Sequence, residues 1–143
     1  MSPNKTFHFE QEGVEVNVPQ PARKIKALSL PRQALKNMPA KPGGFQPGRV
    51  VINIALVYED APDEFLTEFD SPFELRVRYT PGDLRRAQQS NQPLQLAFWD
   101  GSDWVVFTPS KHNFELVPEE RGEGGYGVVQ LSHWGDPNIA WGP

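Results

Sequence analysis

Residues 73–79, FELRVRY, alternate apolar and charged side chains without a break. Because successive side chains of a β-strand point to opposite faces, this alternation predicts a strand with one buried face and one solvent-facing face. Residues 49–58, RVVINIALVY, are apolar almost throughout and rich in β-branched residues. Such a run is typical of a strand at the centre of a sheet or covered on both faces. Together the two strands indicate a sheet buried against a second layer.

Other runs with strand character are separated by turn signals at intervals of roughly ten residues. These runs are residues 13–18, 24–30, 94–99, 104–108 and 127–132. The Asp100-Gly101 turn predicts a β-hairpin between the two runs that flank it. Residues 81–89, where Pro81 opens a run of good helix formers, predict one short helix. The whole pattern predicts an all-β fold, an antiparallel β-sandwich of about seven to nine short strands.

The chain length of 143 residues is close to the commonest size of one domain, and we predict a single domain over residues 1–143. The 15 prolines and 12 glycines are scattered between the apolar runs, as turns between short strands would be. The Gly/Pro-rich residues 39–48 are interpreted as a long loop between strands. Residues 1–20 and 136–143 are expected to be peripheral.

The net charge of −4 gives no electrostatic footprint for nucleic acid, and we interpret the small basic cluster of Arg23, Lys24 and Lys26 as the solvated face of a strand. The chain has no cysteine, which excludes disulfides and cysteine-based zinc sites. No signal-peptide pattern opens the chain and no apolar run reaches roughly 18–20 residues, so we expect no membrane insertion. These features favour the cytoplasm, and an extracellular location stays open for a fragment of a longer protein.

The order of four motifs resembles that of ZU5 domains. These motifs are LPRQAL at residues 30–35, TEFDSPFELRVRY at 67–79, LQLAFWDGSDW at 94–104 and VQLSHW at 129–134. The resemblance covers about residues 25–135. It implies a β-sandwich that serves as an interaction or spacer domain, and some relatives carry a self-cleaving site.

In the self-cleaving relatives a histidine and an apolar residue precede a serine or threonine, whose hydroxyl attacks the carbonyl just before it. The corresponding residues of this chain are His133, Trp134 and Gly135. Glycine carries no nucleophile. The resemblance therefore implies a degenerate processing motif and an intact chain.

A Ser-His-Asp arrangement of Ser132, His133 and Asp136 is the other catalytic interpretation of this segment. Neighbours on a strand point to opposite faces, so Ser132 and His133 are not expected to face each other. Asp136 can approach His133 across a turn. We therefore interpret His133 as a structural residue, hydrogen-bonded where the strand ends, and we expect no enzymatic activity.

No pattern of metal ligands or phosphate-binding glycines stands out. The three histidines, His8, His112 and His133, lack ligand spacing. Acidic residues surround a predicted loop at residues 58–69 without the spacing of an EF-hand, so we do not expect calcium; they are Asp60, Asp63, Glu64, Glu68 and Asp70. The glycines of residues 122–127 precede a strand rather than a helix and predict a flexible turn. No metal site and no cofactor are expected.

All four tryptophans lie in the last third of the chain. Trp104, beside two valines, is predicted to pack between the sheets. Trp99 lies opposite the face of Leu94, Leu96 and Phe98, so we expect Trp99 to be partly exposed, as we do Trp141 in the tail. The alternative is that Trp99 covers the hairpin edge and Trp141 tucks the tail onto the sandwich.

These observations predict a non-catalytic protein-interaction or structural module that presents loops and a sheet edge to another protein or domain. The alternative is a carbohydrate-binding module in which Trp99, Trp134 and Trp141 line a platform for a polysaccharide. At least two of these rings would then be coplanar and solvent-facing. A self-processing protein is a third hypothesis, and Gly135 argues against it.

Overall fold

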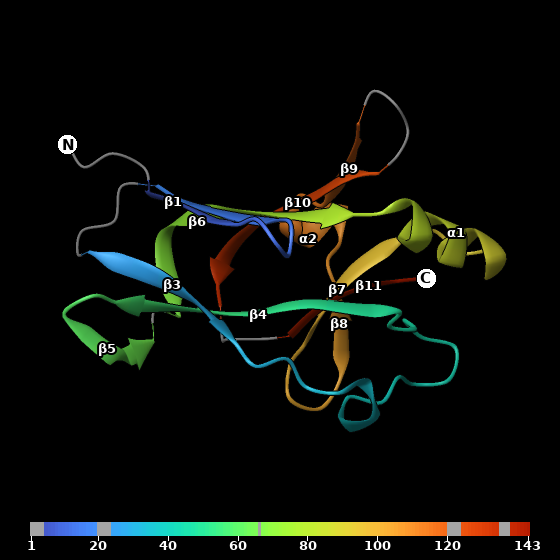
Figure 1. Cartoon of the computed structure of the whole chain (residues 1–143), viewed down its shortest axis with the longest axis horizontal. Helices are drawn as coiled ribbons and strands as arrows, with labels where there is room; N and C mark the ends of the chain where they lie inside the picture. The colour runs from blue at the N-terminus through green and yellow to red at the C-terminus, as the bar shows by residue number, and fades with distance from the viewer. Residues whose placement is uncertain (1–4, 20–23, 66, 120–123, 135–137) are drawn as a thin grey trace.

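The computed structural model describes residues 5–19, 24–65, 67–119, 124–134 and 138–143, which form two antiparallel sheets packed face to face (Figure 1). The first sheet has the order β1 (Lys5–Phe9), β2 (Val14–Val18), β6 (Glu68–Tyr79), β10 (Gly125–His133), β9 (Glu115–Pro118). The second has the order β3 (Ile25–Leu30), β4 (Arg49–Tyr58), β11 (Asn138–Gly142), β7 (Gln95–Trp99), β8 (Trp104–Val106), and β5 (Ala61–Phe65) also pairs with β4. The predicted all-β sandwich is confirmed, with eleven strands in the described residues rather than seven to nine.

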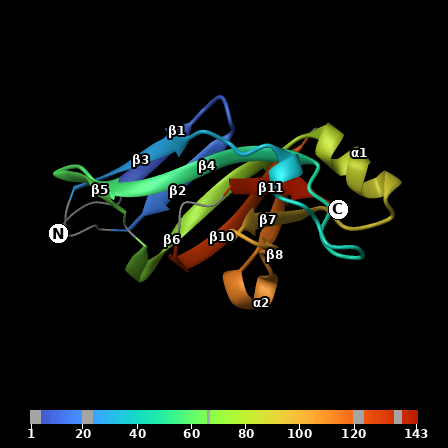
Figure 2. The ribbon, with the colours of Figure 1, turned by 90° about the horizontal axis from the view of Figure 1, so that it is seen from below.

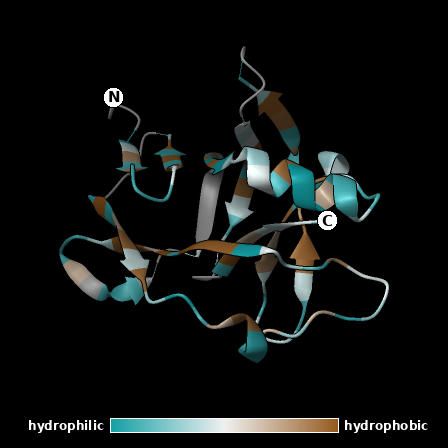
Figure 3. Cartoon of the chain, turned by 45° about the vertical axis from the view of Figure 1, so that its right-hand side comes forward, coloured by the Kyte–Doolittle hydropathy of each residue, from teal (hydrophilic) through white to brown (hydrophobic). Residues whose placement is uncertain are grey.

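The two strands with the strongest sequence patterns, β6 and β4, both contribute to the core. In β6, Phe73, Leu75 and Val77 are buried and the residues between them are not. In β4, every residue from Val51 to Val57 is buried, because β4 is covered on both faces. Figure 3 shows β4 as a largely apolar ribbon through the middle of the molecule. One face of β4 meets the apolar side chains of the first sheet in a single core cluster.

The segment of residues 31–48 covers the other face of the second sheet. Phe45 packs against Ala97 and Ala140 there, and Met38 is fully buried. Trp104 belongs to this outer cluster, 5.6 Å from the ring of Phe45, and its indole N–H donates to the Met38 carbonyl at 2.8 Å. The prediction that Trp104 packs between the sheets is therefore wrong: the loop supplies both an apolar cover and an acceptor on the outside.

The expectation of peripheral chain ends is wrong for two strands. β11 lies between β4 and β7, and all five of its residues are buried. β2 lies between β1 and β6, with three buried valines. A strand buried on both faces shows no polar alternation, so the short run NIAWG carried no periodic signal.

The predicted helix is α1 (Pro81–Gln89), which begins with a capping box. The Thr80 hydroxyl accepts from the Asp83 N–H at 3.2 Å, and the Asp83 carboxylate accepts from the Thr80 N–H at 2.9 Å. The described residues also hold α2 (Pro109–His112) and the 3-10 turn η1 (Leu35–Asn37), which were not predicted.

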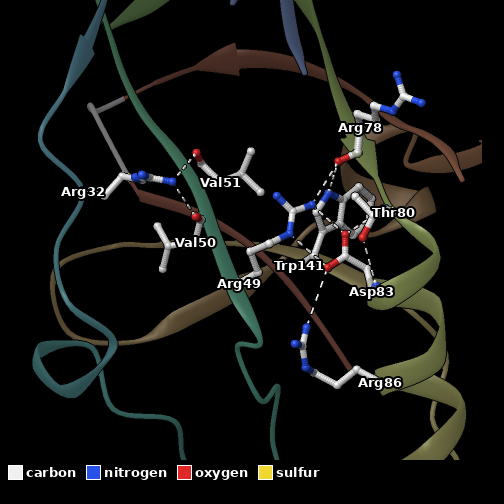
Figure 4. Close-up of polar contacts among 9 residues, drawn as sticks. All are labelled: Arg32, Arg49, Val50, Val51, Arg78, Thr80, Asp83, Arg86 and Trp141. Atoms are coloured by element: carbon white, nitrogen blue, oxygen red, sulfur yellow. Dashed lines mark hydrogen bonds and ion pairs between the residues drawn. The ribbon is translucent and has the colours of Figure 1, made fainter. Parts of the chain in front are cut away.

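Hydrogen bonds among Arg49, Arg78, Asp83 and Trp141, together called the polar clasp, connect α1 to both sheets (Figure 4). The Arg49 guanidinium of β4 donates to both carboxylate oxygens of Asp83, at 3.1 and 2.6 Å. The Trp141 indole N–H of β11 donates to the Arg78 carbonyl of β6 at 2.8 Å, and Arg49 reaches the same carbonyl at 3.5 Å. Asp83 is 2% exposed, so this carboxylate depends on its partners for its charge.

Burial alone would raise the pKa of Asp83, but the hydrogen bonds from Arg49 and Thr80 and the charge of Arg49 lower it overall. The stabilisation is therefore present above about pH 4, the titration range of an unfolded carboxyl, and is lost as the pH falls through the folded-state pKa.

We expect Asp83→Asn to lower the free energy of unfolding by about 2 kcal/mol at pH 7, because the charge-assisted bonds from Arg49 are weakened. The difference from the wild type should shrink in acid. Urea denaturation at pH 7 and pH 3 measures both effects. The control is Lys41→Gln, which removes an exposed ion pair with Asp103 and should cost less than about 1 kcal/mol. An equal loss in the two variants would contradict the role of the clasp.

The close approach of β10 to Trp141 requires a glycine. A Cβ on Gly127 would overlap the Trp141 indole. We expect Gly127→Ala to destabilise the fold by about 1–3 kcal/mol through overpacking. Gly82→Ala in α1, where the new Cβ meets only an ordinary contact 3.6 Å from the Thr80 hydroxyl, should be neutral or stabilising. Thermal unfolding of both variants tests this prediction. An unchanged melting temperature for Gly127→Ala would contradict it and show that the Trp141 side chain can shift to make room.

Candidate functional site

The lateral cleft is a hollow of about 480 Å³ where β10 runs beyond β9 at one side of the sandwich. The β7–β8 hairpin forms one wall and α2 another, and the end of β10, residues 130–134, lines the rest. Figure 2 shows α2 beside β10 and β8. Three residues that the sequence analysis singled out line this cleft: Trp99, His133 and Trp134.

The outer edge of β10 is only partly covered. β6 pairs with one edge of β10 as far as His133, whereas β9 pairs with the other edge only from Gly125 to Val128. Beyond Val128, no strand among the described residues pairs with this outer edge. The backbone of β10 therefore borders the cleft without a neighbouring strand.

The alternation of hydrogen bonds between β9 and β10 identifies which backbone groups of β10 lie on the open edge. The Glu119 N–H donates to the Gly124 carbonyl at 2.9 Å. Because hydrogen-bonded residues alternate along an antiparallel pair, the backbone groups of Gly124, Tyr126 and Val128 point toward β9. Gln130 is the next residue in the same phase. Its N–H and C=O thus point outward into the open edge, while those of Val129 and Leu131 point toward β6.

Aromatic and apolar side chains form the floor and one wall of the cleft. Leu131, Phe107 and Trp134 are buried, at 6%, 2% and 5% exposure. Phe98 and Trp99 are partly exposed, with Phe98 packed 5.1 Å from the Phe107 ring. The expectation that Trp99 is partly exposed is confirmed.

Trp134 and Trp141 do not form an exposed platform. Trp134 is buried, packs edge-on against Phe73 and donates its indole N–H to the Ile54 carbonyl at 2.9 Å. Trp141 is 0% exposed. Each indole links one sheet to a backbone carbonyl of the other, which is why these rings are buried. The predicted platform of Trp99, Trp134 and Trp141 is therefore wrong.

The α2 turn holds His112 in a defined tautomer. The Thr108 hydroxyl caps the turn by accepting from the Lys111 N–H at 3.2 Å, and the Thr108 N–H donates to His112 Nδ1 at 3.0 Å. The proton of the neutral ring is therefore on Nε2. Burial and, second, the charge of Lys111 lower the pKa of His112. At neutral pH His112 is an uncharged hydrogen-bond donor.

The Asp100 carboxylate closes the hairpin turn beside the cleft. Its Oδ1 accepts from the N–H groups of Asp103 and Ser102, at 2.7 and 2.8 Å, and from the Ser102 hydroxyl. The backbone bonds from Asp103 and Ser102 lower the pKa of Asp100, so the group stays ionised. Gly101 has φ +107°, which only glycine adopts readily. The predicted Asp-Gly hairpin is confirmed.

Ser132 and His133 are both exposed and both line the cleft. They lie at the end of β10, where its register with β6 shifts between Leu131 and His133. Among the hydrogen bonds of the described residues, none runs from the Ser132 hydroxyl to an imidazole nitrogen. Gly135 and Asp136 lie outside the described residues.

The other sequence predictions fall elsewhere. The expected loop at residues 58–69 contains β5 and the start of β6, and His8 lies exposed on β1. In the part of the chain that the structure describes, no group of three or more His, Asp or Glu side chains could hold a metal ion. Residues 125–127 of the expected flexible turn are the start of β10, while Arg23 and residues 122–123 lie outside the described residues.

Sequence reasoning missed the α2 wall with Lys111 and His112. Thr108-Pro109 is a good start for a helical turn, since threonine caps and proline suits the first position. Four residues are too few for a periodic signal, so only this capping pair could have located the turn.

Comparisons with known proteins gave no relative: no protein-family model, no curated protein and no solved structure matches this chain. Within the described ranges, no helix has the length and apolar character needed to cross a membrane.

We expect the pKa of His112 to lie below the ordinary value of a histidine, because burial favours the neutral ring. The stability that this provides is present above about pH 6.5 and declines as the pH falls below that value. A proton NMR titration, with His112→Gln to assign the signal, measures this pKa. Nitrogen-15 spectra should show the proton on Nε2, and a proton on Nδ1 would contradict the bond from Thr108.

Proposed function

We propose that this protein is a non-catalytic protein-interaction module that binds an extended polypeptide segment in the lateral cleft. The observation that carries the proposal is the open outer edge of β10 at Gln130, next to an aromatic-lined hollow. An extended segment that adds a strand to such an edge gains main-chain hydrogen bonds, and its alternate side chains fill the adjoining pocket.

The size and lining of the cleft suit this role. A volume of about 480 Å³ lies within the usual range of binding pockets, which is about 300–1,000 Å³. The buried floor is apolar, and the exposed rim carries Lys111, Ser132 and His133. An apolar centre with a polar rim is the common anatomy of a protein interface. The resemblance to ZU5 domains points to the same class of function and stays a prediction.

The carbohydrate alternative has weaker support. Of the three tryptophans expected to form a platform, only Trp99 is partly exposed. A single ring offers one stacking position, and the open backbone edge has no role in sugar stacking. We therefore favour a polypeptide as the ligand.

The test begins with selection of binders from a displayed library of random heptapeptides, followed by titration of one selected synthetic peptide. Gln130→Pro removes the outward N–H without removing a bond to β6, and proline is tolerated where an edge N–H faces solvent. We expect it to weaken binding about tenfold or more. Gln130→Ala keeps the N–H and should bind within about twofold, since a small side-chain change at a rim costs little.

Amide exchange gives a second measurement that does not depend on the folding of Gln130→Pro. In the free wild type, the Gln130 amide should exchange faster than those of Val129 and Leu131, and the bound peptide should slow it. Binding that leaves the exchange of Gln130 unchanged, or that Gln130→Pro does not weaken, would refute strand addition at this edge.

A further inference from the structure

We propose that the segment bound in the lateral cleft carries a carboxylate that pairs with Lys111 and His112, next to an apolar side chain that enters the cleft. This inference rests on the proposed function and adds the chemistry of the partner.

The apolar part follows from the direction of the side chains of β10. Leu131 points into the sandwich and is 6% exposed, whereas Gln130 and Ser132 on either side are more exposed. On a strand paired with this edge, the residue opposite Leu131 points to the same inner face. It would meet Phe98 and Phe107, which line the cleft there. An aliphatic or aromatic side chain suits that position.

The donors of the α2 wall call for an acceptor. His112 carries its proton on Nε2, and in the described part of the chain this N–H meets no protein acceptor. The adjacent Lys111 ammonium is likewise without an ion pair among the described residues. A carboxylate, with two oxygens and a negative charge, satisfies both groups at once.

The acidic group already in the cleft does not fill this role. The Asp100 carboxylate accepts three hydrogen bonds from its own turn, so fixed N–H groups balance part of its charge. Lys111 and His112 have no such local compensation. The donors of α2 are therefore the groups left to be satisfied by a partner.

A second hollow, of about 430 Å³ beside the β1–β2 turn, provides a contrast. It holds two arginines, but Arg49 is paired with Asp83 and Arg78 with Glu119 at 3.3 Å. Its cations already have carboxylate partners within the chain. In the lateral cleft, by contrast, a cation and a partly buried donor lie beside an open strand edge without a partner among the described residues.

The experiment repeats the heptapeptide selection with three proteins: the wild type, Lys111→Glu, and Lys36→Glu as a control of equal charge change outside the cleft. We expect the wild type and Lys36→Glu to select peptides rich in Asp or Glu beside an apolar residue. Lys111→Glu should select basic peptides instead. A synthetic peptide from the wild-type selection should bind Lys111→Glu about tenfold more weakly, and raised salt should narrow this difference.

The two proposals fail in different ways. If the wild type selects peptides without acidic residues and Lys111→Glu selects the same ones, the carboxylate partner is wrong while strand addition stands. If no protein selects any peptide, the proposed function itself is wrong. Quenching of Trp99 fluorescence by polygalacturonate in the absence of peptide binding would assign the carboxylate to a polysaccharide and overturn the polypeptide ligand.

Discussion

The backbone carbonyl of Arg78 is the acceptor on which the packing of the two sheets depends at one end of the sandwich. It lies in β6 of the first sheet and accepts from Trp141 and Arg49, which both belong to the second sheet. Arg49 in turn neutralises the buried Asp83 of α1. One acceptor therefore fixes the positions of two sheets and a helix, and the ring of Trp141 fits only because β10 carries Gly127 where it crosses the indole.

Trp134 performs the equivalent task near the lateral cleft, by donating to Ile54 across the sandwich. It closes the core while β9 stops opposite Val128, because the chain before β9 is used to form α2 instead of a longer strand. The result is a closed interior with an unpaired length of β10 at its side. The cleft is thus a consequence of how the chain is divided between α2 and β9.

The sequence predicted those elements whose signal lies within a few neighbouring residues. The alternation of 73–79, the Asp-Gly hairpin and the capped helix at 81–89 are of this kind. The position of β11 and the burial of Trp134 and Trp141 depend on carbonyl acceptors from distant strands. No local pattern reports such partners. The cleft could not be predicted locally either. His112 and Gln130 line the same cleft only because β10 pairs with β9, which follows α2 in the chain.

An unpaired strand edge carries a risk of association with other copies of the chain, and proteins commonly protect such edges with charge. Here the open length of β10 is short, its register breaks after Leu131, and the Lys111 ammonium lies beside it. A second copy presents the same cation, so two open edges that approach each other bring like charges together. A segment with a carboxylate is instead attracted by the Lys111 ammonium. In the proposed function, the cation that opposes self-association is therefore also the group that would select the acidic segment.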